Sequence, residues 1–112
     1  MKFSVYQESR QGPRKSNQDR VAYCYSRDAL CMVIADGMGG HLHGEVAAQI
    51  ASQFIAEAFQ RSAQPRLADP LKFLLESITN AHHAIVDYAN VRSLLETPRT
   101  TCVACIVQDG LA

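Results

Sequence analysis

The segment IADGMGGHLHGE at residues 34–45 holds the residues best suited to chemistry, because it joins a carboxylate to a glycine-rich turn. Asp36 ends an apolar run, so a buried strand would deliver it directly into that turn. The glycines, starting with Gly37, allow backbone conformations that other residues avoid and let a ligand approach the main chain. A carboxylate and exposed carbonyl groups are hard oxygen ligands, which suit Mg²⁺ or Mn²⁺ rather than zinc or copper. We therefore expect a metal site at Asp36.

Two other interpretations of this segment stay open. The first is a tight strand-to-helix connection in which Asp36 forms a hydrogen bond with its own turn. The second is a nucleotide-binding loop, since a strand, glycines and a helix come in the right order. The spacing argues against the second interpretation. A dinucleotide-binding pattern counted from Gly37 needs a glycine at Leu42, and a phosphate-binding loop needs Lys-Ser or Lys-Thr after its last glycine.

A basic loop at residues 10–19 is the second candidate for chemistry. It places Arg14 and Lys15 shortly before a carboxylate, Asp19. The guanidinium group of arginine is a planar fork that can grip two phosphate oxygens, whereas lysine offers a point charge. Arg14 is therefore the predicted phosphate ligand. The alternative is a solvated basic loop without a partner.

Three segments together resemble one known family. The sequence RKSNQD at residues 14–19 is similar to an arginine-to-acidic motif, and DGMGGH followed by GE within residues 36–45 is similar to a signature motif. RTTCVA at residues 99–104 resembles a paired-threonine strand of the same family. That family is the metal-dependent protein serine/threonine phosphatases (type 2C, or PPM type), in their compact bacterial form. We therefore expect residues 1–112 to be the amino-terminal part of a single phosphatase domain, incomplete at its C-terminus.

The resemblance implies a role for each matching residue. Asp36 would bridge two Mn²⁺ or Mg²⁺ ions, and Gly37 would lend its carbonyl oxygen to one of them. Asp19 would support the site from the neighbouring strand, and Arg14 would hold the phosphate of a phosphoserine or phosphothreonine in a protein substrate. A metal-activated water would then attack phosphorus without a covalent intermediate. The catalytic residues would be Arg14 and Asp36.

Several positions depart from the family pattern. Gln18 replaces a glutamate that many members have, so it would support the metal site by hydrogen bonding without adding charge. Met38 stands where some members have a histidine that protonates the leaving alcohol. His41, His43 or a metal-bound water are the candidates to replace it. The remaining metal-binding aspartates of the family lie in a second half, which Asp109-Gly110 comes too early to replace.

These departures leave rival functions open. We expect the complete form to be a metal-dependent phosphatase and the isolated 112 residues to lack activity. The alternatives are a non-catalytic truncated module or pseudophosphatase, and a nucleotide-binding domain.

The elements that position the site begin with strands. Phe3–Glu8 is rich in residues that favour strands, and Arg20–Ser26 alternates between two faces. Residues 26–28 form a predicted hairpin turn. Leu30–Ala35 is continuously apolar, which is typical of a central strand buried on both faces.

Two helices and another strand follow. Apolar residues recur every four positions from Val46 to Phe59, which predicts an amphipathic helix starting at Gly44. Asp69-Pro70 supplies an N-cap and a first-turn proline for a second helix that runs to about residue 90. Thr100–Gln108 is a further strand, and Asp109-Gly110 is a turn signal. The order strand-strand-strand-helix-helix-strand predicts an α+β fold: part of an α-β-β-α phosphatase sandwich, with helices on one face of a mainly antiparallel sheet.

Composition limits the partners. Lysine plus arginine and aspartate plus glutamate each number 11, so no overall charge recruits nucleic acid or an acidic membrane. No apolar run reaches the length of a membrane-spanning helix, no signal peptide is apparent, and we expect a cytoplasmic protein. A sheet missing its next strand leaves an unpaired edge through which two copies could associate.

Histidine and cysteine patterns suggest no further site. The four cysteines are predicted to be thiols packed in the interior. Cys102 and Cys105 would lie on opposite faces of a strand, which argues against a shared metal or a redox pair. His82 and His83 are predicted to lie on a helix surface.

Overall fold

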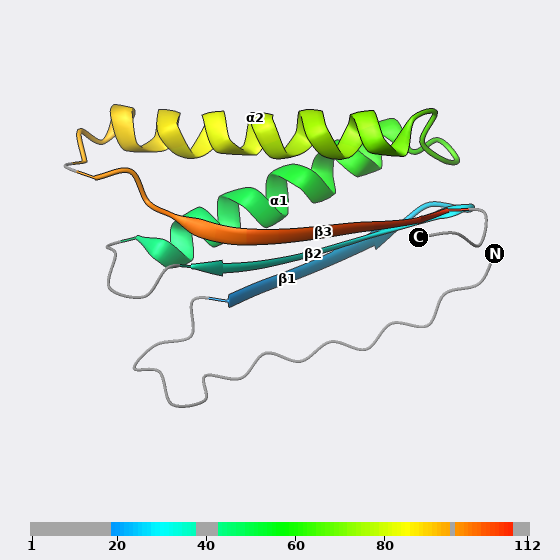
Figure 1. Cartoon of the computed structure of the whole chain (residues 1–112), viewed down its shortest axis with the longest axis horizontal. Helices are drawn as coiled ribbons and strands as arrows, with labels where there is room; N and C mark the ends of the chain where they lie inside the picture. Colours follow the sequence, from blue (N-terminus) through cyan, green and yellow to red (C-terminus); the bar gives the residue numbers. More distant parts are fainter. Residues whose placement is uncertain (1–18, 38–42, 95, 109–112) are drawn as a thin grey trace.

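The computed structural model describes residues 19–37, 43–94 and 96–108. Its elements are the strands β1 (Asp19–Tyr25) and β2 (Ala29–Gly37), the helices α1 (Gly44–Ser62) and α2 (Pro70–Val91), and the strand β3 (Thr100–Gln108) (Figure 1). These elements follow the predicted order. The predicted first strand, Phe3–Glu8, and the predicted turn at Asp109-Gly110 lie outside the described residues.

The strands form an antiparallel sheet in the order β1-β2-β3, so β2 is the central strand of the described sheet, as predicted. The β1–β2 hairpin closes at the predicted turn, where the Ser26 N–H donates to the Ala29 carbonyl oxygen at 2.9 Å. Every residue of β3 has a partner on β2, from Thr100 opposite Gly37 to Gln108 opposite Ala29. This register fixes which residues share the end of the sheet where β2 finishes.

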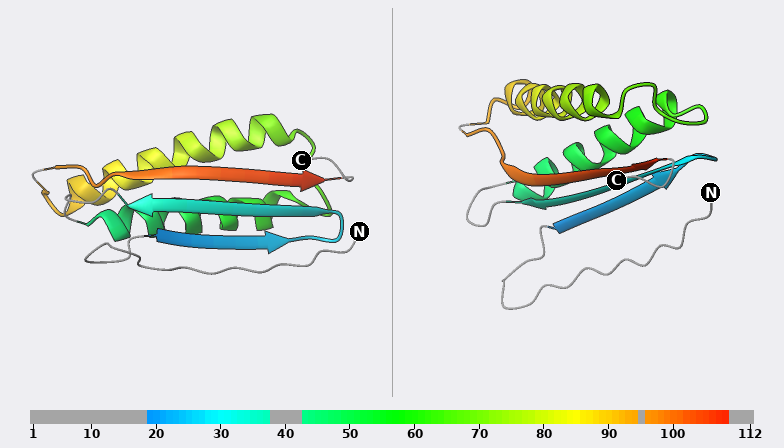
Figure 2. Two further views of the ribbon diagram at one scale, coloured as in Figure 1. Left: turned by 60° about the horizontal axis from the view of Figure 1, so that its bottom comes forward. Right: turned by 45° about the vertical axis from the view of Figure 1, so that its right-hand side comes forward.

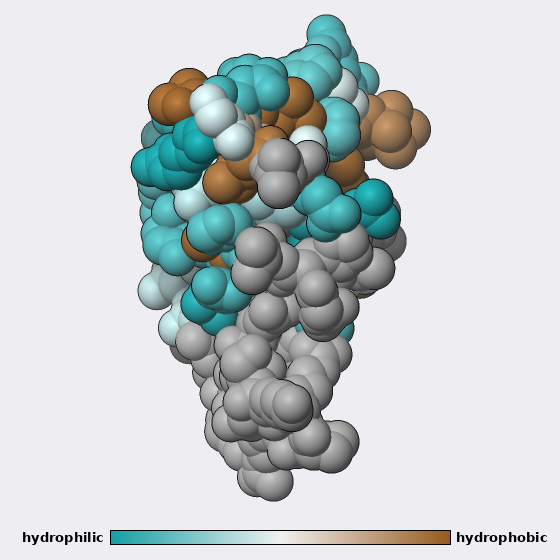
Figure 3. All heavy atoms as spheres, turned by 90° about the vertical axis from the view of Figure 1, so that its left-hand side faces the viewer, coloured by the Kyte–Doolittle hydropathy of each residue, from teal (hydrophilic) through white to brown (hydrophobic). Residues whose placement is uncertain are grey.

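Both helices lie on one face of the sheet, and the left panel of Figure 2 looks onto the opposite face with the helices behind it. α1 packs against the sheet and α2 packs against α1. The α+β architecture with helices on one face is therefore confirmed. Viewed from the end where α2 finishes, apolar side chains lie in separate patches among polar ones (Figure 3).

Each helix forms where the sequence predicts it and for the predicted reason. α1 buries one four-residue repeat against the sheet, made by Ala47, Ala51, Ile55 and Phe59. α2 begins at Pro70 after Asp69, whose Oδ1 accepts a hydrogen bond from the Lys72 N–H at 3.1 Å. This N-cap satisfies one of the backbone donors that a helix start leaves without a partner.

The prediction that β2 is buried on both faces is wrong for the described residues. Cys31 and Val33 are fully buried beneath α1, but Met32 is 37% exposed and Ile34 is 52% exposed. Successive side chains of a strand point to opposite faces, and the described helices cover only one of them. No described element covers the other face of the sheet, which carries these exposed apolar side chains.

The four cysteines are free thiols. Cys24 lies directly opposite Cys31, and both are buried on the helix-covered face. A hydrogen bond from the Cys31 thiol lowers the pKa of Cys24, and the same bond together with burial raises the pKa of Cys31.

The second cysteine pair lies on β3. Cys102 is opposite Ala35 and Cys105 is opposite Met32, so the predicted placement on opposite faces is confirmed. Both residues are half-buried, and burial raises the pKa of the Cys102 thiol. Within the described helices, none is long and apolar enough to cross a membrane.

Candidate active site

Asp36 lies in a row of three residues at the end of the sheet. It is opposite Asp19 on β1 and opposite Thr101 on β3. In an antiparallel ladder, the Cβ atoms of directly opposite residues are about 5 Å apart. The register therefore places two aspartate positions side by side, although they are 17 residues apart in the sequence.

Local structure holds Asp36 at this position. It is half-buried as the penultimate residue of β2, and the buried Gly37 follows it. The Thr101 hydroxyl donates a hydrogen bond to the Asp36 carbonyl oxygen at 3.3 Å, and Thr100 lies opposite Gly37. The paired threonines thus support the backbone that carries the predicted metal ligand.

The other predicted site residues fall outside the described part of the chain. These are Arg14, Gln18 and His41, together with Met38 at the position of the missing acid. Asp19 is described as the first residue of β1. The structure therefore brings together Asp19, Asp36, Gly37 and the threonine pair, and the placement of Arg14 stays a prediction.

His43 fixes the start of α1, on the far side of the glycine-rich segment from Asp36. Its backbone has a φ of 65°, in the left-handed region, and its carbonyl oxygen accepts from the Val46 and Ala47 N–H groups at 3.0 Å each. Non-glycine residues adopt this conformation at a cost of roughly 1–2 kcal/mol. Contacts elsewhere must offset that cost.

α2 supplies those contacts. The Tyr88 ring meets the His43 ring edge-on, with the ring centroids 6.2 Å apart, and the Arg92 guanidinium lies 4.1 Å from the centroid of the Tyr88 ring. The last turns of α2 thus hold the residue that ends the glycine-rich segment. Sequence reasoning missed Tyr88 and the hydrogen bond of Thr101, because both contacts join residues far apart in the chain.

The donor chemistry at the sheet end suits a hard divalent cation. Mg²⁺ and Mn²⁺ prefer oxygen donors. The sheet end offers the carboxylate of Asp36, a second aspartate position opposite it and the carbonyl group of Gly37. The described residues do not complete a site, since no three His, Cys, Asp or Glu residues among them are grouped as a metal cage. The chemistry of these residues fits such an ion, for which they would be part of the ligand set.

Comparison with known proteins decides the family. The family model described as protein phosphatase 2C matches residues 7–112, almost the whole chain. The chain belongs to the protein phosphatase 2C family. The resemblance seen in the sequence motifs is therefore confirmed.

Curated relatives in this family are bacterial serine/threonine phosphatases. The chain is 31% identical over 99 residues to the serine/threonine phosphatase stp of Listeria innocua, which covers 87% of this chain and 39% of that protein. The stp protein of Listeria monocytogenes strain F2365 is 30% identical, with the same coverage. A putative protein phosphatase of Mycoplasma genitalium is 32% identical over 53 residues, covering 46% of this chain and 20% of that protein. The chain thus spans about two fifths of the length of the Listeria relatives that it matches.

Proposed function

We propose that this chain carries the amino-terminal elements of a metal-dependent protein serine/threonine phosphatase. One observation carries the proposal: Asp36, at the end of the central strand, has a second aspartate opposite it and Gly37 after it. Two like charges at opposite positions of a ladder repel each other. A divalent cation held at this end of the sheet would offset that repulsion.

Each residue has a defined task in this proposal. Asp36 holds the divalent ions with its carboxylate, Gly37 contributes its carbonyl oxygen, and Asp19 supports the same site from β1. Thr101 fixes the Asp36 backbone through its 3.3 Å hydrogen bond. Arg14 grips the phosphate oxygens of a phosphoserine or phosphothreonine with its planar fork. When bound, Mn²⁺ or Mg²⁺ supplies an activated water and neutralises charge on the phosphoryl group.

The proposal extends to substrate class and completeness. The relatives are named serine/threonine phosphatases, which supports phosphorylated proteins as substrates. The chain spans 39% of the Listeria innocua protein, which supports a part of one phosphatase domain rather than a complete catalytic unit. We expect metal binding to survive in these 112 residues and turnover to require further ligands.

Manganese binding tests the proposal directly. Electron paramagnetic resonance of free Mn²⁺ should show binding to the wild-type chain and none to Asp36→Asn. Asp28→Asn is the matched control, because Asp28 lies in the hairpin turn at the opposite end of β2 and pairs with Arg27 at 3.4 Å. Equal binding by the wild type and Asp36→Asn would overturn the proposal. A thermal shift with ATP that does not depend on metal would favour a nucleotide-binding domain instead.

A further inference from the structure

Two cysteine thiols share one rung of the β1–β2 hairpin. Cys24 on β1 lies directly opposite Cys31 on β2, and both side chains belong to the apolar core beneath α1. α1 helps to fix the first of them, because the Cys24 thiol donates to the Ala56 carbonyl oxygen at 3.5 Å. In a hairpin the turn fixes the register, so the two thiols stay opposite each other while the hairpin is intact.

The spacing of this rung suits a disulfide bond. Directly opposite residues of an antiparallel ladder have Cβ atoms about 4.5–5.5 Å apart. A disulfide needs Cβ atoms roughly 3.5–4.5 Å apart, so a small approach of the two side chains is enough. The Cys31 thiol already donates a hydrogen bond to the Cys24 sulfur. The two sulfur atoms can therefore join without a change of register.

The two thiols differ in the part that each can play in an oxidation. Cys24 is 8% exposed and Cys31 is fully buried, so an oxidant reaches Cys24 first. The thiolate is the reactive form of a cysteine, and the hydrogen bond from Cys31 favours it by lowering the pKa of Cys24. The same bond and burial raise the pKa of Cys31, which keeps its proton until Cys24 has reacted. Cys24 is therefore suited to attack an oxidant, and Cys31 to resolve the product.

The other two cysteines cannot replace either partner. Cys102 on β3 lies opposite Ala35, which is four residues, or about 13 Å, along β2 from Cys31. Cysteines whose Cα atoms are more than about 7 Å apart cannot be bridged without movement of the backbone. Cys105 lies on the opposite face of the sheet from Cys31. The rung between β1 and β2 is therefore the one place where two of the four thiols meet.

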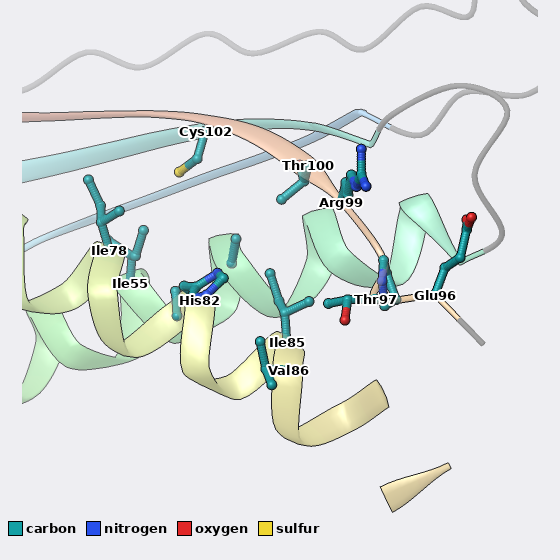
Figure 4. A pocket seen from close by; sticks show the side chains of 13 residues that line it. Ile55, Ile78, His82, Ile85, Val86, Glu96, Thr97, Arg99, Thr100 and Cys102 are labelled. Atoms are coloured by element: carbon teal, nitrogen blue, oxygen red, sulfur yellow. The ribbon is translucent and has the colours of Figure 1, made fainter. Parts of the chain in front are cut away.

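Cys102 provides an internal comparison, because it is more accessible than Cys24. It is half-buried, and Figure 4 shows its side chain pointing into a hollow of about 640 Å³ between α2 and β3. A reagent that enters this hollow meets a thiol without a second thiol beside it. If exposure alone decided which cysteine is oxidised, Cys102 would react before Cys24.

We propose that Cys24 and Cys31 are a redox-active pair that hydrogen peroxide converts into an intramolecular disulfide, which crosslinks β1 to β2. The Cys24 thiolate attacks one peroxide oxygen, the O–O bond breaks, and a sulfenic acid forms while the other oxygen leaves as water. The Cys31 sulfur then attacks the sulfenic sulfur, the S–O bond breaks, and the departing hydroxide takes the Cys31 proton. Two thiols and one peroxide thus give one disulfide and two water molecules.

The crosslink acts on the hairpin and not on the carboxylates of the candidate active site. Asp36 is five residues along β2 from Cys31, so the two side chains point to opposite faces of the sheet. The disulfide therefore does not touch the proposed metal ligands. It prevents β1 from separating from β2 when the hairpin opens locally, which makes oxidation a means of controlling that opening.

Peptide mapping tests the proposal. The 112-residue chain is treated with hydrogen peroxide, unfolded, alkylated at its remaining thiols and digested with trypsin. Arg27 lies between the two cysteines, so trypsin places Cys24 in the peptide 21–27 and Cys31 in the peptide 28–61. Mass spectrometry should show these two peptides joined, with the mass of two hydrogen atoms lost. The link should disappear after treatment with dithiothreitol.

Single variants identify the partners. Cys31→Ala should abolish the link between the two peptides. Cys102→Ala is the matched control, because it removes a more accessible thiol and should leave the link intact. Urea denaturation of each reduced variant checks that it folds, and the wild-type map does not depend on the variants. Hydrogen exchange at the β1 amides should slow when the wild type is oxidised and should not slow in Cys31→Ala.

Three outcomes would overturn the proposal. The first is that Cys24 and Cys31 stay reduced at a peroxide dose that oxidises Cys102. The second is a disulfide within the peptide 100–112, which holds the other two cysteines. The third is a disulfide that forms only between chains, seen as a covalent dimer under non-reducing conditions. Unchanged exchange at β1 in the crosslinked chain would refute the assigned effect on the hairpin. None of these measurements involves metal or turnover, so they stand apart from the test of the phosphatase site.

Discussion

Asp19 lies directly opposite Asp36 in the ladder between β1 and β2. The two positions belong to motifs that are separate in the sequence, and the hairpin brings them to the same rung. This pairing makes the proposed metal site specific: β1 is the strand that would support Asp36, and Asp19 is the residue through which it would do so.

The two aspartates should differ in their effect on metal affinity. Asp36→Asn should abolish Mn²⁺ binding, because it removes the carboxylate that we propose as the principal metal ligand. Asp19→Asn removes a supporting residue and should lower affinity by about 10- to 100-fold. Isothermal titration calorimetry with MnCl₂ measures both. A larger loss for Asp19→Asn than for Asp36→Asn would reverse the assigned roles.

Thr101→Val should weaken the backbone support of Asp36. Valine keeps the shape and the strand preference but loses the 3.3 Å hydrogen bond to the Asp36 carbonyl oxygen. The bond lies at an exposed position, so the free energy of unfolding should fall by about 1 kcal/mol or less. Urea denaturation measures this loss, and titration with Mn²⁺ should show reduced affinity.

Thr79→Val is the control for the effect of Thr101→Val on Mn²⁺ affinity. Thr79 lies on α2, and its hydroxyl donates to the Leu75 carbonyl oxygen at 2.9 Å, away from the sheet end. Its replacement should leave Mn²⁺ affinity unchanged. If both valine variants lower the affinity equally, the role assigned to Thr101 is wrong.

Tyr88→Ala should loosen the start of α1. It removes the ring that contacts His43 and Arg92, and aromatic pairs of this kind contribute about 0.5–1.5 kcal/mol. Hydrogen exchange should become faster at Val46 and Ala47, whose N–H groups donate to the His43 carbonyl oxygen. Tyr88→Phe keeps the ring and should exchange like the wild type. Unchanged exchange in Tyr88→Ala would show that the ring contact does not hold His43.

Stability should fall as the pH rises above about 8.5, the ordinary pKa of a thiol in an unfolded chain. Burial raises the pKa of Cys102 in the folded state, so at alkaline pH the unfolded state loses a proton that the folded state keeps. The contribution is complete below the unfolded pKa and is lost as the pH rises through the folded pKa. Urea denaturation at pH 7 and pH 9.5 under reducing conditions measures the loss. Cys102→Ala should show a smaller difference between the two pH values, and an equal difference would contradict the assignment.

The sequence predicted the elements better than their contacts. Local signals account for this: the N-cap at Asp69 and the four-residue repeat ending at Phe59 place the helices, and alternation places β1. The apolar repeat that predicted the first helix ends at Phe59, whereas α1 continues to Ser62. The last turn consists of exposed polar residues, which leave no periodic signal in the sequence.

Long-range register could not be predicted in the same way. Thr101 meets Asp36 across 65 residues, and His43 meets Tyr88 through the packing of two helices. Burial of β2 was overestimated for a related reason. An unbroken apolar run shows that both faces avoid water, but it does not show what covers each face, and Ile34 stays half exposed in the described structure.

The position of the Asp19–Asp36 rung also bears on the order of folding. The hairpin turns at residues 26–28, so this rung is the one farthest from the turn between the two strands. A hairpin that zips from its turn forms this rung last, and a hairpin that frays opens it first. A cation held by both aspartates would stabilise the end of the hairpin that opens first. Metal occupancy would then report whether the hairpin has closed as far as its last rung.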